Sequence, residues 1–150
     1  MNGLEHIALS VRDLDRSLRF YRDLIGLRVE RIVESPPERG LGAITGLAGC
    51  AARIAHLRSG AFMLELFEYT VPRGQDIPAD RTQADLGFSH MGFSTQDIHA
   101  DWGRLREHGV EFLGEPVEFR PGVWVVYFRG PDGEICELRQ TPQETTRSHV

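Results

Sequence analysis

The chain runs twice through the same series of strand-like and helix-like hydrophobic patterns. LEHIALSV (4–11) alternates, so its apolar residues share one face of a predicted strand and His6 lies on the other. FSHMGFST (88–95) repeats this opening, again with a histidine, His90, as its third residue. Each opening leads into an aspartate that is typical of a helix N-cap. We therefore expect two structural modules of similar size.

The first module continues as a helix followed by three strands. Asp13 is placed to cap the helix, and Gly26 is placed to end it after an apolar stripe at helical spacing. A stretch rich in Pro and Gly over 35–49 predicts a loop, and Ser59-Gly60 predicts a tight turn. The predicted strands of this module are 4–11, 27–33, 52–60 and 61–69.

The second module follows a linker over 71–87 that has no hydrophobic period. Asp97 is placed to cap its helix, which is predicted to end at Gly109. We expect a single domain over 1–150, with module one at about 4–70, module two at about 88–140 and a flexible tail over 141–150. The predicted strands of the second module are 88–95, 110–119, 122–130 and 134–140.

Composition argues against several classes of function. The net charge of −5 and the lack of clustered Lys and Arg argue against a nucleic-acid partner. No apolar run reaches the roughly 18 residues that a membrane span needs, and the N-terminus does not resemble a signal peptide. Cys50 and Cys136 form neither a metal-binding spacing nor a disulfide framework. We therefore expect a cytoplasmic protein without a membrane partner.

Each module also ends in a strand that carries a glutamate between apolar residues, MLELF (63–67) and ICELR (135–139). Alternation places Glu65 and Glu137 opposite the apolar side chains that would pack against the helices. Burying a carboxylate costs several kcal/mol unless a cation or hydrogen-bond donors compensate. A lone strand histidine or glutamate is usually structural, but repetition at matching module positions favours a shared site. The candidate metal ligands are His6, Glu65, His90 and Glu137.

Two imidazoles and two carboxylates suit one divalent ion of intermediate hardness, such as Zn, Ni, Co, Mn or Fe. Four protein ligands on an octahedral ion leave positions for water or substrate oxygens, which Lewis-acid chemistry requires. The remaining histidines lack the repeated strand context, and we interpret them as structural or surface groups. They are His56, His99, His108 and His149.

These segments resemble the vicinal oxygen chelate superfamily, which includes glyoxalase I, methylmalonyl-CoA epimerase, extradiol dioxygenases, fosfomycin-resistance enzymes and bleomycin-binding proteins. The resemblance covers about residues 4–140. It implies an α+β fold in which two βαβββ modules form an open, incomplete barrel around a central metal site. Carried over by position, the same two histidines and two glutamates are the ligands. The matching segments are LEHIALSVRDLDRSLRFYRDLIGL, FMLELFEY, FSHMGFSTQDI and YFRGPDGEICELRQ.

The set of four ligands is most similar to the glyoxalase I and epimerase branch, because extradiol dioxygenases and fosfomycin-resistance enzymes use three. That branch implies a metal-dependent lyase or isomerase, which transfers a proton next to a carbonyl through a metal-stabilised enediolate or enolate. Either Glu65 or Glu137 would be the base. Two alternatives stay open: an extradiol-type dioxygenase, and a non-catalytic drug- or metabolite-binding protein of the bleomycin-resistance kind.

The resemblance also implies a small-molecule substrate, whose identity stays open along with that of the metal. We expect a homodimer, because short strands in half-open sheets leave edges that need covering. Several apolar and aromatic side chains are candidates for the apolar walls of the pocket, with ordinary core or rim packing as the alternative. These are Met63, Phe67, Tyr69, Trp124 and Tyr127.

Overall fold

The computed structural model describes residues 3–142. The chain divides into two compact units, Met1–Asp76 and Ile77–Val150, and the boundary falls inside the linker predicted over 71–87. Most of the tail predicted over 141–150, including His149, lies outside the described residues. The single-domain organisation stays a prediction.

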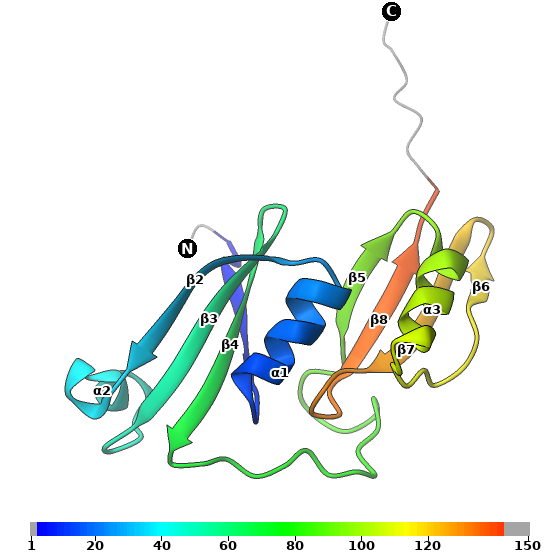
Figure 1. The fold of residues 1–150 in the computed structure, drawn as a ribbon. Helices are drawn as coiled ribbons and strands as arrows, with labels where there is room; N and C mark the ends of the chain where they lie inside the picture. The colour runs from blue at the N-terminus through cyan, green and yellow to red at the C-terminus, as the bar shows by residue number, and fades with distance from the viewer. Residues whose placement is uncertain (1–2, 143–150) are drawn as a thin grey trace, which may run out of the picture. The chain divides into compact units, whose positions relative to one another are not determined.

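The first unit is built on an open sheet with a helix across one face (Figure 1). Within the described residues this sheet has four strands in the order β1-β4-β3-β2, with β1 parallel to β4 and the other neighbours antiparallel. The strands are β1 (His6–Ser10), β2 (Arg28–Ser35), β3 (Ala51–Ser59) and β4 (Phe62–Val71).

The helix of the first unit begins where the sequence predicts. The side chain of Asp13 accepts a hydrogen bond of 2.8 Å from the backbone N–H of Arg16, as an N-cap does. The helix is not uniform, however: α1 (Leu14–Leu18) continues as a π-helical segment, η1 (Arg19–Leu24). Gly26 follows with φ of 92°, a left-handed conformation that suits glycine and ends the helix.

The prediction of a continuous loop over 35–49 is wrong. A 3-10 turn, η2 (Pro37–Arg39), and a short helix, α2 (Leu41–Thr45), lie within it. Gly40 and Gly46 flank α2 with φ of 80° and 75°, in the left-handed region that glycine adopts without strain. These glycines therefore begin and end a helix, although in the sequence they are typical of a loop.

The second unit repeats the topology of the first (Figure 1). Within the described residues its sheet has four strands in the order β5-β8-β7-β6, with β5 parallel to β8. Asp97 caps the helix by accepting a 3.0 Å hydrogen bond from the backbone N–H of Ala100. The elements are β5 (Met91–Thr95), α3 (Ile98–Glu107), β6 (Val117–Arg120), β7 (Val123–Arg129) and β8 (Ile135–Gln140).

Two strands of the second unit are shorter than predicted. β5 begins three residues later than expected, so His90 lies just before the strand. The strand predicted over 110–119 is reduced to β6, because Gly114 and Pro116 interrupt the pattern. Phe112 makes only an isolated bridge to Phe128 of β7.

The helices cover the apolar faces of the sheets, as the alternating pattern predicts. α1 contacts β4, and α3 contacts β8. Leu66 of β4 and Ile98 of α3 are fully buried, and Leu138 of β8 is nearly so. Glu65 and Glu137 alternate with these residues and so lie on the helix-free faces. None of the helices in residues 3–142 has the length and apolar content that a membrane crossing needs.

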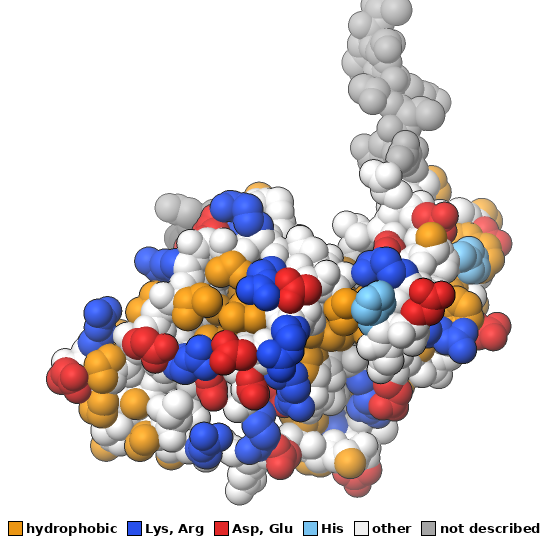
Figure 2. All heavy atoms as spheres, viewed as in Figure 1, with side chains coloured by type: hydrophobic (Ala, Val, Ile, Leu, Met, Phe, Trp, Pro, Cys, Tyr) orange, Lys and Arg blue, Asp and Glu red, His pale blue; other side chains and the backbone are white. Residues whose placement is uncertain are grey.

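Acidic and basic side chains are mixed over the face of the molecule seen in Figure 2. On the first unit, Arg53 of β3 lies among three acidic side chains. Its guanidinium lies 3.2 Å from Asp15 of α1, 3.2 Å from Glu34 of β2 and 3.1 Å from Glu68 of β4. The charges therefore neutralise one another locally and form no single-sign patch around this arginine.

Leu66→Ala should lower the free energy of unfolding by about 2–5 kcal/mol, because it opens a cavity beneath α1. Leu86→Ala is the matched control, since Leu86 is 100% exposed while Leu66 is 0% exposed. The control should change stability by less than about 0.5 kcal/mol. Urea unfolding followed by circular dichroism measures both variants. Equal losses in the two variants would contradict the assignment of the core.

Candidate metal centre

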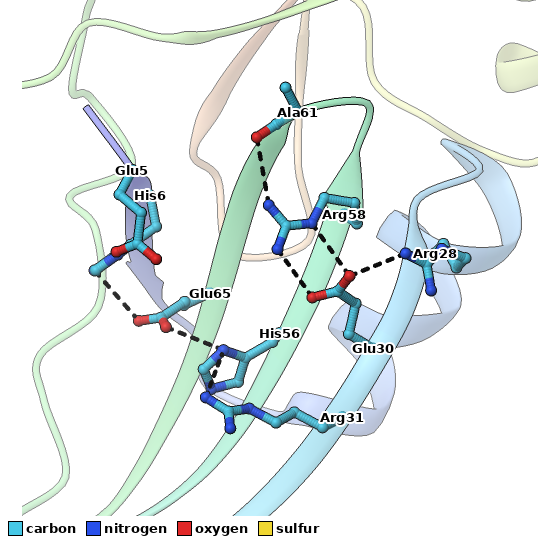
Figure 3. Close-up of polar contacts among 9 residues, drawn as sticks. All are labelled: Glu5, His6, Arg28, Glu30, Arg31, His56, Arg58, Ala61 and Glu65. Atoms are coloured by element: carbon cyan, nitrogen blue, oxygen red, sulfur yellow. Dashed lines mark hydrogen bonds and ion pairs between the residues drawn. The ribbon is translucent and has the colours of Figure 1, made fainter. Parts of the chain in front are cut away.

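His6 and Glu65 lie together on the helix-free face of the first sheet (Figure 3). Because β1 and β4 pair in parallel with Ala8 opposite Glu65, His6 falls on the same face as the carboxylate. Nε2 of His6 lies 3.6 Å from Oε2 of Glu65. The glutamate side chain is 13% exposed and the histidine side chain 41% exposed, so the carboxylate is the better shielded of the two.

His90 and Glu137 form the equivalent pair in the second unit. β5 and β8 pair in parallel with Gly92 opposite Glu137. His90 precedes Gly92 by two residues, as His6 precedes Ala8 in the first unit. Nε2 of His90 lies 3.5 Å from Oε2 of Glu137, whose side chain is 14% exposed. A methyl group at Gly92 would lie 3.7 Å from Oε1 of Glu137, an ordinary contact, which agrees with the alanine at the matching position of the first unit.

The other ring nitrogen of each histidine contacts the preceding residue. Nδ1 of His6 lies 2.9 Å from a carboxylate oxygen of Glu5, and Nδ1 of His90 lies 2.9 Å from the hydroxyl of Ser89. When Nδ1 carries the proton and donates it to these oxygens, Nε2 keeps a free lone pair on the glutamate side. This arrangement is typical of metal-binding histidines.

The pKa of His6 is raised above its ordinary value, mainly by the hydrogen bond to Glu5 and further by the negative charge of Glu65. A metal ion would compete with a proton for this ring. Affinity for a cation at His6 should therefore increase as the pH rises through that pKa.

His56 lies beside Glu65, although the sequence predicts only a structural or surface role for it. It is 8% exposed, and its Nδ1 lies 3.1 Å from Oε1 of Glu65 (Figure 3). Burial lowers the pKa of His56, so the neutral ring is favoured. The turn predicted at Ser59-Gly60 is wrong by one residue, because Ser59 pairs with Phe62 and the turn lies at Gly60-Ala61. The predicted turn would set His56 opposite Met63, whereas the observed register sets it opposite Glu65.

Tyr127 occupies the corresponding place beside Glu137, since β7 and β8 set the two residues opposite each other. Burial raises the pKa of Tyr127, and the charge of Glu137 and a hydrogen bond to its carboxylate raise it further. The ring of His90 meets the Tyr127 ring edge-on at 5.1 Å. This predicted pocket residue therefore adjoins the second His–Glu pair.

The remaining pocket candidates divide between the two faces of the sheets. Met63, Phe67 and Tyr69 alternate along β4 on the face of Glu65, and the rings of Phe67 and Tyr69 stack at 5.6 Å. Trp124 lies on the helix side of the second sheet, with its ring 4.8 Å from that of His99 in α3. The structure therefore does not bring Trp124 to the face that carries Glu137.

Each unit contributes one His–Glu pair. Within residues 3–142, no group of three or more His, Cys, Asp or Glu side chains is arranged so that it could hold a metal ion. An imidazole nitrogen and a carboxylate oxygen are donors that suit a divalent cation of intermediate hardness. The chemistry of both pairs therefore fits the expected ion, and the meeting of the two pairs at one ion stays a prediction.

Two sheet modules of the same βαβββ order define the fold class as α+β with an internal repeat. The chain belongs to the Glyoxalase/Bleomycin resistance protein/Dioxygenase superfamily, whose family model matches residues 3–138. This membership confirms the predicted superfamily, and the similar glyoxalase-family structures confirm the α+β fold.

Three relatives illustrate the membership. The chain is 32% identical over 150 residues to a 2-epi-5-epi-valiolone epimerase of Actinomyces sp, covering 93% of this chain and 80% of the relative. It is 27% identical over 146 residues to a probable lactoylglutathione lyase of Synechocystis sp., covering 92% and 95%. The crystal structure of a glyoxalase family protein from Bacillus cereus matches with a TM-score of 0.85 at 26% identity, covering 93% and 94%.

Glu5→Gln should lower the pKa of His6 in the metal-free protein, because the amide removes the charged acceptor of its Nδ1–H. Titration of the His6 ring resonances by NMR measures the change. Glu38→Gln, a change at another exposed glutamate, is the control and should leave that pKa unaltered. An unchanged pKa in Glu5→Gln would show that the Glu5 contact does not set the protonation of His6.

Proposed function

We propose that this protein is a metal-dependent lyase or isomerase that transfers a proton next to a carbonyl group. The observation that carries the proposal is the repeated pair, in which histidine Nε2 faces glutamate Oε2 at 3.6 Å in one unit and 3.5 Å in the other. Relatives named as an epimerase and as lactoylglutathione lyases support the same class of reaction.

His6, Glu65, His90 and Glu137 would hold one divalent ion, drawn from Zn, Ni, Co, Mn and Fe. The two pairs come either from one chain or from two chains of a homodimer, and one ion per chain results in both arrangements. When bound, the metal would act as a Lewis acid that stabilises the negative charge developing on the substrate oxygen.

A glutamate carboxylate would remove the proton from the carbon next to the carbonyl and return it to that carbon or its neighbour. Both candidates, Glu65 and Glu137, are largely shielded from water, with side chains 13% and 14% exposed. A carbon next to a carbonyl is a weak acid, and its deprotonation depends on stabilising the negative charge that develops on the substrate oxygen. Shielding from water strengthens the electrostatic interactions that provide this stabilisation. The proton transfer is therefore assigned to this pair of carboxylates.

The substrate would be a small molecule that carries a carbonyl beside a carbon-bound hydrogen. Half-buried aromatic rings flank both carboxylates and provide apolar contact for its carbon skeleton: Phe67 and Tyr69 beside Glu65, and Tyr127 beside Glu137. Lactoylglutathione and 2-epi-5-epi-valiolone are the first substrates to test, since the relatives' names contain them.

Glu137→Gln should lower kcat by about 10²–10⁴-fold while the protein stays folded, because the amide neither accepts the substrate proton nor supplies a charged ligand to the metal. The reaction in D₂O should place deuterium on the carbon next to the carbonyl in the wild type. Glu107→Gln, a change at an exposed glutamate at the end of α3, is the control and should keep full activity.

The proposal fails if Glu137→Gln retains full activity on a substrate that the wild type turns over. It also fails if activity on that substrate survives complete removal of divalent metal. Oxygen uptake during turnover would instead identify the dioxygenase alternative, and tight metal-independent binding without turnover would identify the binding-protein alternative.

A further inference from the structure

Glu65 is contacted on both of its oxygens by different strands. Oε2 lies 3.6 Å from Nε2 of His6 on β1, while Oε1 lies 3.1 Å from Nδ1 of His56 on β3 (Figure 3). Oε1 therefore contacts a residue of β3, and Oε2 lies beside the candidate ligand His6. A carboxylate with one oxygen engaged in this way has a fixed orientation for its other oxygen.

The proton on His56 is assigned by its neighbours. Nδ1 lies 3.1 Å from the Glu65 carboxylate and 3.5 Å from Nη2 of Arg31. A guanidinium only donates hydrogen bonds and a carboxylate only accepts them, so Nδ1 can serve one of the two. The contact to Glu65 is the shorter of the two and its acceptor is charged, so we assign the proton of the ring to Nδ1.

The second unit keeps a donor at the matching position. His56 stands opposite Glu65 in the pairing of β3 with β4, and Tyr127 stands opposite Glu137 in the pairing of β7 with β8. Tyr127 carries its hydroxyl on the strand beside Glu137, and burial together with the charge of that carboxylate raises the pKa of the phenol. The residue type differs, but both modules place a hydrogen-bond donor on the strand beside the glutamate. Two independent strand pairings therefore support a role for these donors.

We propose that His56 is a positioning residue of the candidate metal centre: its Nδ1–H holds Oε1 of Glu65 and leaves Oε2 beside Nε2 of His6 for the cation. This inference rests on the proposed function, because it assigns Glu65 to a metal. Removal of the buried His56 imidazole leaves Oε1 of Glu65 without this contact, so the Glu65 side chain can turn away from His6.

Binding of Co²⁺ to the metal-free full-length protein, followed by visible absorption and by competition with a chelating dye, tests the inference without a substrate. His56→Leu should weaken Co²⁺ binding by about 10–100-fold. His56→Asn should restore most of the affinity, since the amide nitrogen of asparagine stands at the position of Nδ1. His56→Gln carries its amide one bond further out and should restore less.

Two controls separate positioning from a general effect on the fold. His99→Leu removes a histidine of α3 and should leave Co²⁺ affinity unchanged. In a Glu65→Gln background, His56→Leu should cause no further loss, because His56 acts through the Glu65 carboxylate. Circular dichroism and the thermal midpoint confirm that each variant is folded, and the comparison of His56→Asn with His56→Gln remains decisive if His56→Leu unfolds.

Equal Co²⁺ affinity in the wild type and a folded His56→Leu variant overturns the inference and leaves the proposed function standing. Equal Co²⁺ affinity in His56→Asn and His56→Gln also overturns it. So does a further loss of Co²⁺ affinity when His56→Leu is added to Glu65→Gln. A wild type that binds no Co²⁺ at all overturns the proposed metal centre and this inference together. The graded order of wild type, Asn, Gln and Leu supports the inference.

Discussion

The structure depends most on the placement of one shielded carboxylate on the helix-free face of each sheet. A carboxylate removed from water needs a cation or hydrogen-bond donors, or the fold loses several kcal/mol. Here the parallel pairing of β1 with β4 supplies His6 at a fixed register, and His90 directly precedes the first paired residue of β5. The same backbone pairing that builds the sheet therefore also places an imidazole beside Glu65 and beside Glu137.

The antiparallel neighbour of the glutamate strand adds the second contact in each module. In the first unit it is the imidazole of His56, and in the second it is the phenol of Tyr127. Each carboxylate thus lies between a candidate ligand on one strand and a donor on another. The modules share this arrangement but differ in the donor, so the two glutamates have the same position and different surroundings.

The sequence predicts the succession of strands and helices along the chain well, because alternation and capping are local properties. Asp13 and Asp97 cap their helices through their own side chains, and these signals can be read without tertiary information. The His–Glu pairs follow from repetition of a local pattern. The superfamily is confirmed by the family model, which spans nearly all of the described residues.

Other features depend on packing and on pairing between strands, which no local pattern specifies. The π-helical segment η1 needs bonds from i to i+5, such as that from Ile25 to Phe20, and the sequence alone favours an ordinary helix there. The sequence does not predict α2, because the glycines at its ends are also typical of loops. The role of His56 depends on Glu65, its neighbour across the turn, and the residues next to His56 in the sequence do not indicate that partner. Trp124 is a different case: it lies three residues from Tyr127 in the strand predicted over 122–130, so alternation alone places the two on opposite faces and only one of them on the face of Glu137.

The central claim is that both His–Glu pairs serve a single cation, and metal stoichiometry tests it most directly. Elemental analysis of the purified, dialysed protein should find one divalent ion per chain in the wild type. His6→Ala and His90→Ala, each on its own, should lose nearly all of the bound metal. Two ions per chain, or half of the metal kept in each single variant, would show that the pairs act separately and would contradict the account.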